Sequence, residues 1–122
     1  MADFYIKQGD DRPPLQATLE DGLGNRVDID GADVLFIMRF IRDPDTGRRP
    51  GPVLLSSPAN NDQAGEATKG DVSYDWSPGD TDIAGGYRAE WEVTFQDGGV
   101  ETFPDYKHLR IAIIDELEAE AS

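Results

Sequence analysis

The chain alternates between apolar and polar residues in short stretches that are separated by turn-forming residues. The clearest stretch covers residues 87–95, where the odd positions are Tyr, Ala, Trp, Val and Phe and the even positions are Arg, Glu, Glu and Thr. Successive side chains of a β-strand point to opposite faces, so this period of two predicts a half-buried strand with its aromatic face toward a core. Residues 96–99 include two glycines suited to a tight turn, and apolar residues return at 100–103. We therefore expect a β-hairpin here.

Other stretches carry strand patterns as well. They cover residues 4–7, 15–19, 27–29, 34–41, 53–55, 72–76 and 109–114. Turn residues at 21–25 join two of them, which predicts a second hairpin over residues 15–29. Residues 34–41 are apolar on both faces apart from Arg39. Eight residues are few for a buried helix, and the β-branched and aromatic content favours a central strand.

These elements predict a single all-β domain, an antiparallel immunoglobulin-like β-sandwich of about eight strands with long loops, over residues 1–114. Residues 115–122 are expected to form an acidic C-terminal tail that needs a neighbour to order it. The long loops fall at residues 43–52 and in the polar stretch 57–70. The inward positions of the strands give the predicted core: Phe36, Met38, Trp76, Tyr87, Trp91, Val93, Phe95 and Ile111.

Composition narrows the functional classes. The 122 residues include 11 basic and 25 acidic ones, for a net charge of −14. Such a surface repels phosphate backbones and anionic membranes, so neither nucleic acid nor a membrane is expected as a partner. The chain has no cysteine, and its sequence shows neither a spanning apolar run nor a signal-peptide pattern. We expect a protein that stays soluble where it is made.

Four carboxylates, Asp71, Asp75, Asp80 and Asp82, fall close together in the sequence. Paired acids can perform general acid and base catalysis, so a carboxylate hydrolase is one hypothesis. Along their predicted strand, however, Asp71 and Asp75 alternate with the apolar residues, so their side chains point to the opposite face. The preferred interpretation is a solvated strand face together with turn caps.

Two further motifs resemble sites of known chemistry. Residues 43–47, Asp-Pro-Asp-Thr-Gly, begin like a calcium loop, but Arg48 and Leu54 occupy the sixth and twelfth positions, where such a loop needs Gly and Glu. A surface turn is the better interpretation. His108 is the only histidine, and no nucleophile elbow accompanies it. We predict no enzyme activity, no cofactor and no metal site.

The large aromatic residues could alternatively line a sugar-binding groove, which would make the chain a carbohydrate-binding module. Their positions are Phe36, Phe40, Trp76, Tyr87, Trp91 and Phe95. Each occupies a core-facing position in the alternation of its strand or belongs to the strand that is apolar on both faces. A core is therefore the preferred interpretation.

The order and spacing of these motifs resemble the immunoglobulin-like N-terminal domain of phage baseplate upper proteins and the short tail-module proteins similar to it. The resemblance covers about residues 3–113 and rests on residues 4–10, 13–19, 21, 24–25, 27–29, 31–34, 36–39, 72–76, 79–81 and 84–104. It implies a non-catalytic sandwich that docks on other virion proteins, assembled in the bacterial cytoplasm as a symmetric multi-copy part of the tail tip, baseplate or neck. A capsid decoration (cement) protein is the alternative within this class.

The predicted partner-binding residues are those that lack an obvious place in the core. They are Arg48, Arg49, Pro50, Val53, Leu54 and Leu55. Two adjacent arginines in so acidic a chain are expected either to pair with the chain's own carboxylates or to meet an acidic neighbour.

Overall fold

The computed structural model describes residues 2–104 and 109–115, and this part of the chain is built almost entirely from β-strands. The elements are β1 (Phe4–Lys7), β2 (Leu15–Thr18), β3 (Asp33–Phe40), β4 (Val53–Pro58), β5 (Asn60–Asn61), the short 3-10 helix η1 (Glu66–Thr68), β6 (Asp71–Tyr74), β7 (Gly85–Thr94), β8 (Val100–Phe103) and β9 (Leu109–Ile114). The predicted all-β class is confirmed.

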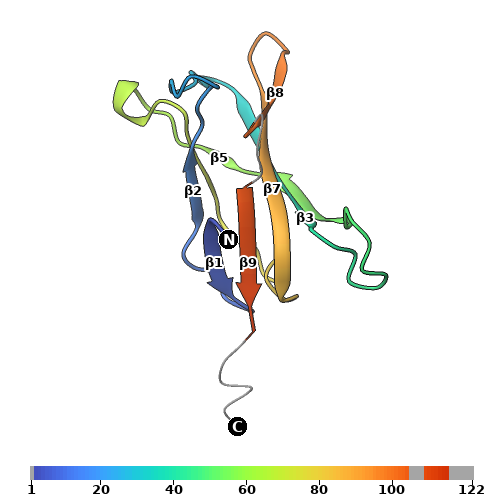
Figure 1. Ribbon diagram of the computed structural model, residues 1–122. Coiled ribbons are helices and arrows are strands. Elements are labelled where there is room, and N and C mark those ends of the chain that lie inside the picture. Colours follow the sequence, from blue (N-terminus) through green and yellow to red (C-terminus); the bar gives the residue numbers. More distant parts are fainter. Residues whose placement is uncertain (1, 105–108, 116–122) are drawn as a thin grey trace.

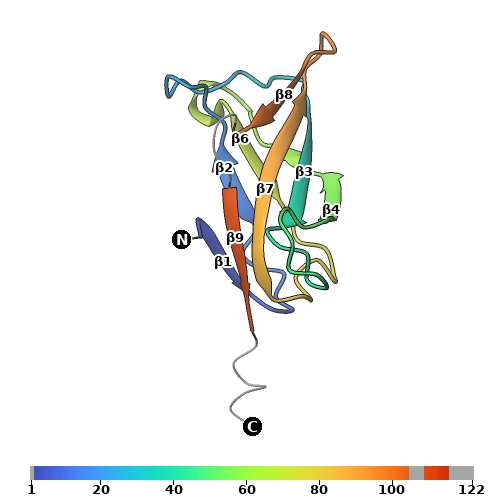
Figure 2. The ribbon, with the colours of Figure 1, turned by 45° about the vertical axis from the view of Figure 1, so that its right-hand side comes forward.

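The strands form two sheets that pack as a sandwich (Figures 1 and 2). The large sheet has the order β1-β9-β7-β3-β4, with β8 also paired to β7, and the small sheet has the order β2-β6-β5. The chain crosses from one sheet to the other between β4 and β5. At this crossing the Ala59 N–H donates to the Val34 carbonyl oxygen at 2.9 Å.

Strand β7 is the centre of the large sheet. One edge pairs with β3 along eight residues, from Asp33↔Thr94 to Phe40↔Tyr87. The other edge is shared, because β8 pairs with its end and β9 with its beginning. The predicted hairpin of β7 and β8 is therefore confirmed, and its turn contains Gly98 at a φ of 89°, which favours glycine.

The first and last strands pair in parallel, which the prediction of an antiparallel sandwich did not include. Phe4 lies opposite Ile111, and Lys7 lies opposite Ile114. Alternation within a strand shows which face is buried but carries no information on the direction of a partner far away in sequence. The other strand pairs are antiparallel.

The second predicted hairpin, over residues 15–29, is wrong beyond its turn. Only one isolated bridge, Glu20↔Arg26, joins the two arms among the described residues. Strand β2 pairs with β6 instead, and the Leu19 N–H already donates to the Gly70 carbonyl oxygen. The Ile29 N–H donates to the side chain of Gln63, so its backbone leaves the ladder while its side chain stays fully buried.

The core lies between the sheets and is centred on Phe36. Its ring packs against Tyr74, Trp76 and Trp91, with centroid distances of 4.6, 5.9 and 5.0 Å. The predicted core residues are buried, with Phe95 as the exception. Phe95 follows the last residue of β7 and its backbone closes the hairpin turn, so its side chain is only partly buried.

Tyr87 stands near the start of β7 and anchors the preceding loop. Its buried hydroxyl donates to the carbonyl oxygen of Ile83, four residues upstream. This local bond is similar to the tyrosine corner of immunoglobulin-like sandwiches. Burial raises the pKa of the Tyr87 phenol to about 12, because the ionised form cannot be hydrated there.

We predict that Trp91→Ala lowers the free energy of unfolding by about 3–5 kcal/mol, because it removes a large aromatic ring from a closed core. Trp91 is 1% exposed, whereas Tyr5, the matched control, is 54% exposed. Tyr5→Ala should change stability by less than about 1 kcal/mol. Urea denaturation measures both, and a small effect of the Trp91 variant would show that Trp91 is not a core residue.

The raised pKa of Tyr87 predicts a loss of stability at alkaline pH. A group whose pKa is higher in the folded state stabilises fully below its unfolded value, near 10, and this stabilisation disappears as pH rises toward 12. Tyr87→Phe should therefore reduce the difference in unfolding free energy between pH 8 and pH 11. The exposed control, Tyr5→Phe, should leave that difference at its wild-type value.

Candidate docking surface

The loop at residues 43–52 is organised by its first residue. The Asp43 carboxylate accepts hydrogen bonds from the backbone N–H groups of Asp45 (2.7 Å) and Thr46 (3.3 Å). The Asp43 N–H donates to the Arg48 carbonyl oxygen at 2.8 Å. These bonds form a surface turn, as predicted, and the loop projects from one end of the sandwich (Figure 1).

The six predicted docking residues fall into two groups. Arg48, Arg49 and Pro50 are exposed in the loop, and Val53 is 50% exposed at the start of β4. Leu54 and Leu55, by contrast, are half-buried and pack against the core. They were expected to lack a place in the core, and this premise is wrong for both.

The burial of the two leucines follows from the pairing of β4 with β3. Leu55 lies opposite the buried Met38, and the register shifts between Met38 and Arg39, so that Leu54 is an extra residue at a bulge. Strand β4 is the last strand on its side of the large sheet, so no strand of residues 2–104 and 109–115 pairs with its other edge. The exposed part of the predicted site is therefore the loop and this edge.

Sequence reasoning missed a second basic feature, which we call the arginine row: Arg39, Arg88 and Arg110. Arg39 lies directly opposite Arg88 in the pairing of β3 with β7, and Arg88 lies directly opposite Arg110 in the pairing of β7 with β9. The neighbours of each arginine along its strand point into the core. The three guanidinium-bearing side chains therefore lie side by side on the outer face of the large sheet.

The arginine row has few partners in the part of the chain that the structure describes. The Arg39 Nε donates to the Gly51 carbonyl oxygen at 2.9 Å, which links the row to the base of the 43–52 loop. The Arg88 Nε is buried and has no hydrogen-bond partner among these residues. The one ion pair within 4.0 Å in the same part of the chain joins Lys69 to Glu66, far from the row.

The outer face of the small sheet carries an open groove with acidic side chains. We call it the acidic groove; its carboxylates are Asp62, Asp71 and Asp75. The hydroxyl of Thr18 donates to Asp71 Oδ1 at 2.7 Å, and the Asn60 amide donates to Asp75 Oδ2 at 2.9 Å. The predicted placement of Asp71 and Asp75 on the outward face of their strand is confirmed.

The other two acids of the predicted cluster lie elsewhere. The Asp80 carboxylate accepts hydrogen bonds from the Tyr74 hydroxyl at 2.6 Å and from the Ser77 N–H at 2.9 Å, so it caps the turn after β6. Burial, together with the bond to Asp80, raises the pKa of Tyr74. The backbone oxygen of Asp82 accepts a hydrogen bond from Gln8. No group of three or more potential ligands that could hold a metal ion occurs among the described residues.

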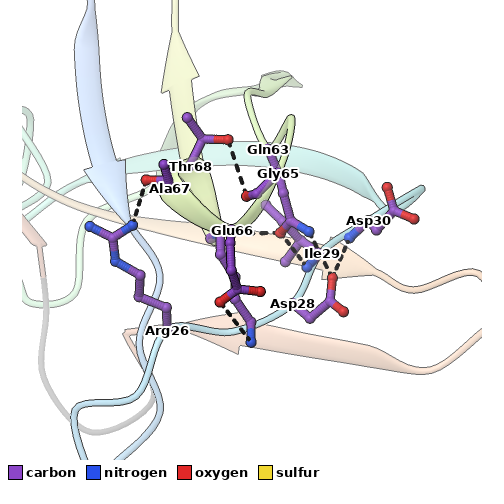
Figure 3. Close-up of polar contacts among 11 residues, drawn as sticks. Arg26, Asp28, Ile29, Asp30, Gln63, Gly65, Glu66, Ala67 and Thr68 are labelled. Carbon is purple, nitrogen blue, oxygen red and sulfur yellow. Dashed lines mark hydrogen bonds and ion pairs between the residues drawn. The ribbon is translucent and has the colours of Figure 1, made fainter.

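The loops that precede β3 and β6 lie at the opposite end from the 43–52 loop (Figure 1). Gln63 joins these two loops (Figure 3). Its Oε1 accepts hydrogen bonds from the N–H groups of Ile29 (2.8 Å) and Gly70 (3.1 Å). Its amide nitrogen donates to Asp28 Oδ1 at 2.8 Å. The bond from Gln63, followed by one from the Asp30 N–H, holds the pKa of Asp28 below its usual range. The network fixes the loop that failed to form the second hairpin.

The remaining sequence candidates are placed as follows. Phe36, Phe40, Trp76, Tyr87 and Trp91 are buried, as expected for core residues. His108 and residues 116–122 of the expected tail lie outside the described residues. In the chain as described, no helix has the length and apolar character needed to cross a membrane.

We predict that Gln63→Ala lowers the free energy of unfolding by about 1–3 kcal/mol, because it leaves the Ile29 N–H without a partner next to the core. It should also raise the pKa of Asp28 toward its ordinary value, as measured by NMR titration. Gln16→Ala, which removes an exposed amide from β2, is the control and should change neither quantity. A normal Asp28 pKa in the wild type would contradict the network.

No protein-family model matches the chain, and no curated protein matches it either. Among solved structures, CopC from Methylosinus trichosporium OB3b is similar over 95% of this chain and 87% of its own, with 13% sequence identity and a TM-score of 0.45. The resemblance to phage baseplate domains stays a prediction.

Proposed function

We propose that this chain is a non-catalytic structural protein of the bacteriophage virion, an adaptor or accessory subunit of the tail tip, baseplate or neck that docks on other virion proteins. The order and spacing of its sequence motifs support the virion assignment. The observation that carries the docking role is the exposed corner formed by the 43–52 loop and the free edge of β4.

The exposed corner combines features that suit protein contacts. Arg48 and Arg49 are exposed in the loop, and Val53 is exposed at the start of β4, so the corner includes both cationic and apolar groups. The free edge of β4 offers backbone groups to a strand of another chain. Bonds from Asp43 and Arg39 hold the loop at both of its ends, so a partner meets a surface that is largely formed in advance.

The side chains first considered for chemistry have structural roles that favour this function over the alternatives. Asp80 caps a turn with Tyr74, which does not suit a hydrolytic pair. Trp76, Tyr87 and Trp91 pack in the core, so they do not form the platform of a carbohydrate-binding module. A capsid decoration protein would use the same exposed corner, and the location in the particle decides between head and tail.

Immunogold labelling of purified particles of a phage that encodes this chain tests the proposal. We expect gold at the tail tip, baseplate or neck. Gold on the head would identify a decoration protein, and particles that lack the protein would overturn the virion assignment.

The role of the exposed corner is tested by measuring how much of each variant chain is incorporated into particles. Arg48→Glu combined with Arg49→Glu should reduce the incorporated amount by about tenfold or more, since reversed charges at an interface disfavour the complex. The matched control is Arg12→Glu combined with Arg26→Glu, which changes the net charge equally at exposed positions away from the corner. Equal incorporation of both variants would show that the corner is not the docking site.

A further inference from the structure

We propose that the arginine row of one copy of this chain binds the acidic groove of a second copy, so that copies associate head to tail. The contact rests on the proposed function only for its setting in a multi-copy assembly. The two surfaces themselves belong to the isolated chain, where they can be tested.

An anionic partner would stabilise the arginine row. Like charges directly opposite each other on neighbouring strands destabilise a sheet, and here three cations are aligned across β3, β7 and β9. Arg88, in the middle, has a buried Nε without a hydrogen-bond partner among the described residues. A carboxylate placed over the row would relieve the repulsion and accept hydrogen bonds from the guanidinium groups.

The rows on either side limit where such a partner can lie. On one side the facing pair is Gly86 and Ala112, which adds no charge. On the other side Glu90 lies opposite Ile37, and Glu92 lies opposite Leu35, so this flank is acidic. Neither glutamate forms an ion pair within 4.0 Å in the described part of the chain. The cationic strip is thus narrow and suits a groove better than a broad acidic surface.

The acidic groove supplies the complementary groups. It is hollowed into the outer face of the small sheet, and the carboxylates of Asp62, Asp71 and Asp75 line it. Thr18 donates to one oxygen of Asp71, and Asn60 donates to one oxygen of Asp75. These bonds orient the two carboxylates. Within the described residues their second oxygens accept no hydrogen bond and are available to arginine.

A second copy fits the row better than a nucleic acid does. The negative charge of a phosphate chain extends beyond the narrow row and meets the glutamates beside it, whereas the groove presents three carboxylates within a limited area. The row and the groove belong to the outer faces of different sheets. The contact therefore joins different surfaces of the two copies, and repetition produces a ring or a filament.

Analytical ultracentrifugation of the whole chain at low ionic strength tests the contact. We expect concentration-dependent association that weakens with added salt, because the pairs are partly exposed. Arg88→Glu should weaken association by about tenfold or more, and so should Asp71→Asn combined with Asp75→Asn. Arg12→Glu, with the same charge change outside both surfaces, is the control and should associate almost like the wild type.

Mixing provides the decisive measurement. Neither the Arg88→Glu chain nor the Asp71→Asn, Asp75→Asn chain should self-associate, but each keeps one intact surface, so a mixture should form 1:1 pairs and nothing larger. Arg110→Glu, at an exposed position, serves in place of Arg88→Glu if that chain fails to fold by circular dichroism.

Three outcomes would overturn the contact. They are a monomeric wild type at every concentration, a mixture that forms no pairs, and association that depends on residues 116–122 but not on the groove. None of them affects the immunogold result, so this contact and the virion assignment can fail separately.

Discussion

Strand β7 is hydrogen-bonded along both of its edges, and the rest of the large sheet takes its position from this pairing. One edge holds β3, and the other holds β9 and β8 in succession. The inward side of β7 carries Tyr87, Trp91 and Val93, all fully buried or nearly so. Trp91 packs against Phe36 with tilted rings, and Phe36 in turn stacks on Tyr74, which connects the large sheet to the small one. Backbone pairing and aromatic packing thus act on the same few residues.

The strands and the core could be predicted from the sequence because both depend on local alternation. The hairpin of β7 and β8 and the position of β3 inside the sheet, away from its edges, follow from patterns within a few residues. Ile29 shows the limit of this reasoning. The alternation correctly indicates that its side chain points into the core, but its N–H donates to the side chain of Gln63, 34 residues away. The parallel pairing of β1 with β9 could not be predicted for the same reason, since it joins strands from the two ends of the described chain.

The candidate surfaces show the same limit. Arg48 and Arg49 were predicted to bind a partner because they have no place in the core. They are exposed in a loop, as expected. Leu54 and Leu55 were assigned to the same group because a bulge opposite Met38 and Arg39 leaves no local signal. The arginine row was missed for a further reason. Its three members are separated by 49 and 22 positions, and only the register of two strand pairs brings them together.

The crossing between β4 and β5 has a consequence for how the molecule loses its structure. One continuous stretch pairs first with β3 and then with β6, and the side chain of Asn61 also binds the carbonyl oxygens of Ile29 and Ala32. The strands of the small sheet are only four, four and two residues long, and its inward side chains belong to the core shared with the large sheet. Separation of the small sheet would break the pairing of β5 with β6 and expose the shared core, so the two sheets should melt as one cooperative unit. In an assembly, such a subunit is either entirely folded or entirely lost.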